Sequence, residues 1–157
     1  MSMPSPPLAT DENLFASLPG GQAVIDWFGF CPVFHDGTLE RLELSDGNAV
    51  LSVRTYRMTS KIEANGFYVA DRHASVTLRM RGVTGMRLDG DAGSIISELL
   101  IRRLQTDPPR ADWQSCAGPV TGNIEITFGT AVGLYGSIFA KELAFELQPG
   151  GGPLSVG

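Results

Sequence analysis

The sequence predicts a mainly β fold, or an α+β fold with minor helix: a strongly curved antiparallel sheet or open barrel of about 6–8 strands, preceded by one or two short N-terminal helices. Two observations lead to this prediction. Beyond residue 38, apolar and polar residues alternate with a period of two, and turn residues separate the alternating segments. Helical spacing of apolar residues is clearest before residue 30. We therefore expect a sheet with one covered face.

Two short helices are expected at the start of the folded part. Thr10 is a suitable N-cap, and acidic residues follow it in the first turn. Apolar residues at spacings of three and four predict a second helix over residues 23–28, and Gly29 is placed to end it in a left-handed conformation. We expect Trp27 and Phe28 to pack onto the concave face of the sheet.

The alternating segments predict the strands. Residues 42–55 hold two alternating runs around Asp46-Gly47-Asn48, which is the turn chemistry of a hairpin. Residues 74–81 give the clearest half-buried strand, and residues 83–88 are expected to add a short neighbouring strand. Three more strands are expected at residues 124–128, 134–140 and 142–147.

Residues 94–104 fit two structures. Ser94 could cap a helix that carries Ile95, Ile96, Leu99 and Leu100, whereas residues 99–104 could equally form a strand. We expect a turn followed by a strand.

A single domain is expected, because a chain of 157 residues and 16.8 kDa can bury its own core. Proline-rich residues 1–9 and glycine- and proline-rich residues 149–157 are predicted to be flexible tails, which leaves residues 10–148 as one β-rich domain. The start lacks a secretion-signal pattern, and no apolar stretch is long enough to span a bilayer. We therefore expect a cytoplasmic protein without membrane association.

The charge balance bears on the class of partner. The net charge of −5 and the pI near 4.9 disfavour nucleic-acid binding. Residues 1–53 carry one basic residue against seven acidic residues, a net of −6, whereas ten of the twelve basic residues lie between Arg54 and Arg110. Either each strand carries its own solvated charges, or an acidic surface faces a basic partner.

The sequence contains no recognisable active site, cofactor motif or metal site. The two histidines, His35 and His73, share no metal-ligand spacing. His35 and Asp36 follow Phe34 where the helical pattern ends, and they fit a hydrogen-bonded turn, a partner contact, or a base with its orienting carboxylate. The two cysteines, Cys31 and Cys116, are interpreted as buried thiols. No cofactor, metal or catalytic residue is predicted, and an enzymatic activity is not expected.

The residues Trp27-Phe28-Gly29, Pro32 and Phe34-His35-Asp36, followed by the alternating strand at Leu42 and Leu44, resemble the fiftieth immunity-protein family of bacterial polymorphic toxin systems. The resemblance covers residues 22–148, and its specific pattern lies in the first twenty or so of these. It departs at Gly37, where a small or acidic side chain is typical. The resemblance implies a small, cytoplasmic, mainly β inhibitor that neutralises a cognate toxin by direct binding and has no reaction of its own.

Several functions fit these observations. The first is the immunity-type binding protein, with Trp27, Phe34, His35 and Asp36 as candidate binding residues and a protein toxin as partner. The second is a ligand-binding or structural β domain, marked by an apolar cavity with a few convergent polar groups. The third is a small enzyme that uses His35 and Asp36. Exposed sheet edges also make a homo-oligomer possible.

Overall fold

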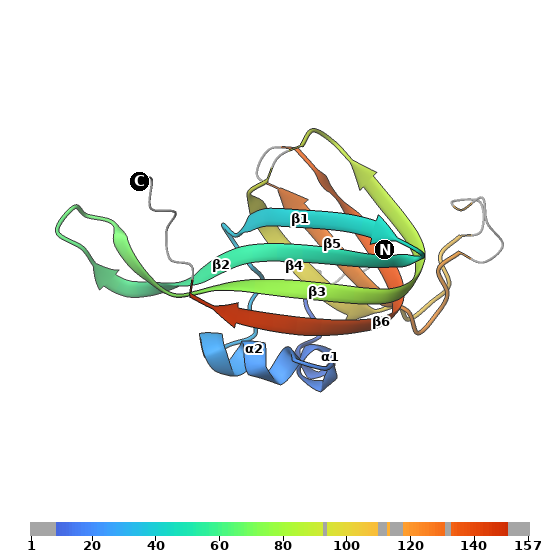
Figure 1. Cartoon of the computed structure of the whole chain (residues 1–157), viewed down its shortest axis with the longest axis horizontal. Coiled ribbons are helices and arrows are strands. Elements are labelled where there is room, and N and C mark those ends of the chain that lie inside the picture. The colour runs from blue at the N-terminus through green and yellow to red at the C-terminus, as the bar shows by residue number, and fades with distance from the viewer. Residues whose placement is uncertain (1–8, 93, 110–112, 114–117, 131–132, 151–157) are drawn as a thin grey trace, which may run out of the picture.

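The computed structural model describes residues 9–92, 94–109, 113, 118–130 and 133–150. Within these residues, six strands form one antiparallel sheet in the order β1-β2-β3-β6-β5-β4 (Figure 1). The elements are α1 (Glu12–Ser17), α2 (Gly21–Phe28), β1 (Thr38–Ser45), β2 (Asn48–Ile62), β3 (Tyr68–Asp89), β4 (Ile96–Arg103), β5 (Ile124–Thr130) and β6 (Tyr135–Pro149). The predicted mainly β class, with minor helix, is confirmed. So is the strand in the ambiguous segment 94–104.

Both predicted helices form, with one change at the first N-cap. The Asp11 carboxylate, and not Thr10, caps α1 by accepting a hydrogen bond from the Leu14 amide at 3.0 Å. The Thr10 hydroxyl instead accepts from the Ile101 amide of β4 at 3.2 Å. Gly29 ends α2 with a φ of 82°, as predicted.

Two pairs of predicted strands are each one continuous strand. Residues 83–88 are not a neighbour of the strand at 74–81, because β3 continues through both segments. A register shift lies between Val83 and Gly85, and Gly82 has a φ of 64°, so β3 bends at an irregularity instead of turning back. In the same way, the strands predicted at 134–140 and 142–147 are one strand, β6. Only Leu134, the first residue of the first predicted strand, lies outside it.

The sheet is strongly curved but is not closed into a barrel. Three backbone hydrogen bonds join residues 36–39, around the start of β1, to residues 94–96, around the start of β4, and no continuous ladder links these two end strands. The bonds run from Asp36 N to Ile96 O, from Ile96 N to Gly37 O and from Leu39 N to Ser94 O, at 2.9, 2.7 and 2.6 Å. The curvature therefore brings the segment before β1 against β4.

The two helices cover the edge of β6 that β5 leaves free. β5 pairs with β6 only over residues 136–140, and beyond this the Phe145 amide donates to Pro19 O at 2.7 Å. The Phe15 ring of α1 stacks on Phe145, with 4.3 Å between centroids. Both helices lie beside β6 in Figure 1. Phe28 is buried in this core as expected, whereas Trp27 is only partly buried at its margin.

The predicted tails fall mostly outside the described residues, which exclude residues 1–8 and 151–157. Pro149 is the last residue of β6, and the Gly150 amide donates to His73 O at 2.7 Å, so the folded part reaches residue 150. In the described part of the chain, no helix has the length and apolar character needed to cross a membrane.

Candidate functional site

The loop between α2 and β1 is held in an unusual backbone conformation. Phe34 and Asp36 have φ values of 61° and 62°, a region that residues other than glycine seldom occupy. The Phe34 side chain, which is only 2% exposed, anchors the loop in the core. Val33 O accepts from Leu99 N at 2.8 Å, and Asp36 N donates to Ile96 O. Tertiary contacts therefore fix the strained segment in place.

Gly37, the departure from the immunity-protein pattern, has a steric explanation. A Cβ atom at this position would lie 2.8 Å from Val53 Cγ1 and 2.9 Å from Phe34 O. A side chain here would push the loop away from β2, so the close approach requires glycine.

The loop and β2 together form a groove of about 390 Å³. Its apolar side chains include Phe30 and Met58, which are 50% and 51% exposed, and the exposed Val33. Exposed apolar side chains that gather around a hollow are typical of surfaces that contact other molecules. The lining residues are Phe30, Pro32, Val33, Phe34, His35, Asp36, Thr55, Tyr56 and Met58. We name this set the groove.

His35 and Asp36 lie together on the exposed wall of the groove. His35 Nδ1 lies 2.7 Å from the Ser97 carbonyl oxygen, which can only accept, so Nδ1 carries the proton. The other ring nitrogen, Nε2, is 3.5 Å from Asp36 Oδ2. The two side chains are 70% and 51% exposed. Both side chains are therefore placed to hydrogen-bond a molecule that enters the groove.

Tyr56 is a groove residue that the sequence analysis did not single out. Partial burial, with a smaller effect of the Asp36 charge, raises the pKa of its phenol. The hydroxyl therefore stays protonated at neutral pH and can donate a hydrogen bond beside the Asp36 carboxylate. Phe30, Val33 and Met58 are further groove residues not identified from the sequence.

Next to the groove, the β2–β3 hairpin projects beyond the rest of the sheet (Figure 1). β1 pairs with β2 only as far as Arg54, and β6 pairs with β3 only from Ala74 onward. We name residues 56–73 the arm. Its exposed apolar side chains include Ile62 and Phe67, in addition to Met58 of the groove. Within the residues that the structure describes, both edges of the arm lack a neighbouring strand, so its backbone groups can pair with another chain.

Trp27 lies at the base of the arm and does not line the groove. Its indole nitrogen donates to the Arg72 carbonyl oxygen at 3.1 Å, and the Arg72 guanidinium lies 4.9 Å from the ring centroid. Arg57 makes two hydrogen bonds of 2.8 Å to the Asp71 carboxylate, and a longer one of 3.4 Å to Phe28 O. These contacts connect α2 to the arm. Of the four candidate residues, the structure thus places Phe34, His35 and Asp36 in the groove and Trp27 beside it.

Acid is expected to weaken the base of the arm. The hydrogen bonds from Arg57 hold the pKa of the Asp71 carboxyl below its ordinary value of 3.8. Because this pKa is lowered in the folded state, the ion pair contributes its full stability at pH values above the ordinary pKa of 3.8. That stability is lost as the pH falls through the lowered pKa of the folded state. An NMR titration of the Asp71 carboxyl carbon should give a midpoint below 3.8, and Arg57→Gln should move it back up. An unchanged midpoint in Arg57→Gln would contradict this assignment.

The Cys31 thiol is expected to be unreactive. Cys31 is only partly buried, and not fully buried as expected. This partial burial, aided by the Glu12 charge, raises the pKa of its thiol from 9.0 to about 11. At pH 8 the folded Cys116→Ser variant should react with iodoacetamide roughly 100-fold more slowly than the same variant in urea. Equal rates in the two states would show that the thiol is not protected. Cys116 itself lies outside the described residues.

Comparisons with models of protein families, with curated proteins and with solved structures find no match to this chain. In the part of the chain that the structure describes, no group of three or more His, Cys, Asp or Glu side chains is arranged to hold a metal ion. The groove and the arm are therefore interpreted from their own geometry.

Proposed function

We propose that this chain is a non-enzymatic binding protein of the immunity type, which neutralises a cognate bacterial toxin in the cytoplasm by direct contact. The main support is the groove, where exposed Phe30, Val33 and Met58 surround the polar pair His35 and Asp36. A patch with apolar anchors and a polar rim is the usual composition of a protein-binding surface.

The anchoring of the groove also supports binding. The buried Phe34 side chain and the backbone hydrogen bonds to β4 hold the loop in one conformation before any partner arrives. A preorganised loop loses little conformational entropy on association, which favours a tight complex. The edges of the arm, which have no neighbouring strand in the described part of the chain, add backbone donors and acceptors next to the same surface.

Among the residues that line the groove, Asp36 is the one acidic side chain, and none is a lysine or an arginine. Glu40 pairs with Arg54 and Glu43 pairs with Arg41, so these two acidic side chains are largely neutralised. Asp36 remains exposed in the groove. We propose a toxin with a basic contact surface, whose affinity falls moderately as the salt concentration rises.

A pull-down of the purified chain against the products of its neighbouring genes tests this function. The expected result is one-to-one binding of a single product, with loss of that product's toxicity when the two are expressed together. If the neighbouring products neither bind nor become less toxic, the immunity function is wrong.

Groove variants test where the partner binds. Val33→Asp and Met58→Asp place a charge among the apolar anchors, and each should weaken the complex by about 30-fold or more. Leu44→Asp is the matched control, because Leu44 is also an exposed apolar residue but does not line the groove. Circular dichroism melting curves verify that all three variants fold. Equal affinity of the groove and control variants would place the interface elsewhere.

A further inference from the structure

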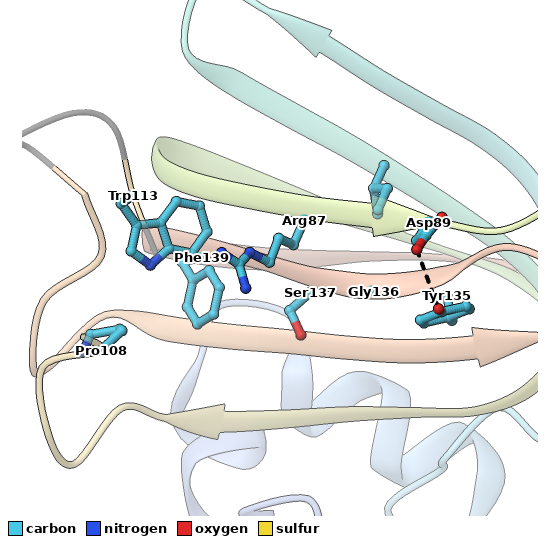
Figure 2. Close-up of a pocket in the computed structure, with 9 residues that line it drawn as sticks. Arg87, Asp89, Pro108, Trp113, Tyr135, Gly136, Ser137 and Phe139 are labelled. Carbon is cyan, nitrogen blue, oxygen red and sulfur yellow. Dashed lines mark hydrogen bonds between the residues drawn. The ribbon is translucent and has the colours of Figure 1, made fainter. Parts of the chain in front are cut away.

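Two further cavities lie on β3 and β6, separate from the groove. One, of about 450 Å³, is lined by residues that include Trp113 and Phe139, and we name it the aromatic cavity (Figure 2). Its Arg87 is already engaged, because the guanidinium carbon lies 5.0 Å from the centroid of the Trp113 ring. The other, of about 590 Å³, lies further along the same two strands and reaches the turn between α1 and α2. We name it the basic cavity.

The basic cavity gathers positive charge in a chain whose net charge is −5. It lies on the face of the sheet away from the core, because Arg79 and Arg81 line it whereas Met80, between them, is buried. Its charged lining residues are Arg79, Arg81, Arg103, Lys141, Glu142 and Glu146, four basic against two acidic, a net of +2. Arg79 Nε and Glu146 Oε1 form an ion pair at 2.5 Å. The cavity should therefore attract anions.

Arg81 and Lys141 present unpaired charges to this cavity. Both residues are exposed, and in the described part of the chain neither side chain forms a hydrogen bond or an ion pair. Glu142 is opposite Arg81 in the register of β3 and β6 but does not pair with it. Arg103 Nη1 donates to the Gly122 carbonyl oxygen at 2.7 Å, which holds the guanidinium and leaves its other N–H groups available. Arginine and lysine side chains of this kind are the usual partners of phosphate groups.

The shape of β3 sets the position of Lys141. Gly82 has a φ of 64°, and a Cβ atom there would lie 3.1 Å from Lys141 Cδ and 3.3 Å from its Cβ and Cγ atoms. The stem of Lys141 therefore lies against the strand where β3 has no side chain, directly after Arg81. The Gly82 amide donates to Asn48 Oδ1 at 3.1 Å, so the β1–β2 turn holds this irregularity in place. The two unpaired cations are thus brought together by the fold.

The rest of the lining is apolar. Leu18 and Pro19 come from the turn between the two helices, and Ala144 comes from β6. All three keep some exposed surface, so a ligand can contact them. The volume of the cavity falls in the range of small-molecule sites. A small molecule with an anionic group and an apolar part therefore matches the cavity.

We propose that the basic cavity binds a small organic phosphate. Its phosphate group contacts Arg81 and Lys141, with Arg103 as a further cation, and its apolar part lies against Leu18 and Pro19. A phosphate monoester carries nearly two negative charges at neutral pH, which matches the net charge of the lining better than a single negative charge does. This ligand site does not depend on the proposed toxin binding.

The test uses phenyl phosphate, which joins a flat apolar ring to a phosphate group. Ligand-observed NMR at low salt and about pH 7.5, where the phosphate is mostly a dianion, should show saturable binding to the full chain with a dissociation constant of about 1 mM or lower. Phenyl sulfate has the same ring but one charge, and inorganic phosphate lacks the ring, so each should bind at least about fivefold more weakly. Absence of saturable binding of phenyl phosphate, or equal binding of either control ligand, overturns the proposal.

Variants distinguish the basic cavity from other surfaces. Arg81→Gln and Lys141→Gln each remove one unpaired cation and should weaken phenyl phosphate binding by about fivefold or more. Arg87→Gln is the matched control, because it makes the same change of charge on β3 but beside the aromatic cavity; it should bind the probe like the unchanged chain. Melting curves verify that the variants are folded. Unchanged binding in Arg81→Gln and Lys141→Gln, or a loss in Arg87→Gln alone, would contradict the site.

Discussion

Replacement of Gly20 by alanine is expected to cost about 3–5 kcal/mol of unfolding free energy. Gly20 has a φ of 78°, and a Cβ atom there would lie 2.0 Å from the Phe145 carbonyl oxygen. The obstacle is the backbone of β6, which cannot move aside like the end of a flexible side chain. The substitution should therefore separate the helices from β6, where Pro19 and Phe145 are hydrogen-bonded.

Gly47→Ala is the matched control for this prediction. Gly47 has a similar φ of 74° but no atom within 4 Å of an added Cβ, so only the backbone strain remains, about 1 kcal/mol. Urea denaturation of the two variants separates strain from steric clash. Equal losses of stability would mean that the helices are not held against β6 as described.

Phe28→Ala should also cost about 3–5 kcal/mol of unfolding free energy, because Phe28 is 1% exposed in the core. Phe30→Ala, two residues further along and half exposed, should change stability by less than about 0.5 kcal/mol. It should instead weaken partner binding, since Phe30 lines the groove. Urea denaturation and a binding titration of both variants test this division. A large loss of stability in Phe30→Ala would make Phe30 a structural residue.

Much of the fold could be predicted because local patterns agree with the tertiary structure. The turn at Asp46 and Gly47, where φ is 53° and 74°, follows directly from its residue types. Local patterns could not show that β3 and β6 are each one continuous strand and not two. Near Gly82, the irregularity in β3 interrupts the alternation of apolar and polar residues, as a turn would. Only the pairing of β3 with β6 on both sides of this point shows that the strand continues.

The groove was only partly predictable. His35 and Asp36 stood out by residue type, in a loop that follows a helix. Phe30 and Met58 did not, because single exposed apolar residues are common on protein surfaces. Only the approach of the loop to β2 brings them together. The bond from Trp27 to Arg72 spans 45 residues of sequence, and no local pattern indicates it.

Amide hydrogen exchange of the chain, alone and in complex with its partner, tests the central claim most directly. If the groove and the arm form the binding surface, exchange should slow in residues 30–36 and 56–62 on complex formation. Residues 135–139 of β6, which belong to neither the groove nor the arm, should exchange unchanged. Protection confined to other regions, with no change in the groove, would contradict the proposed interface.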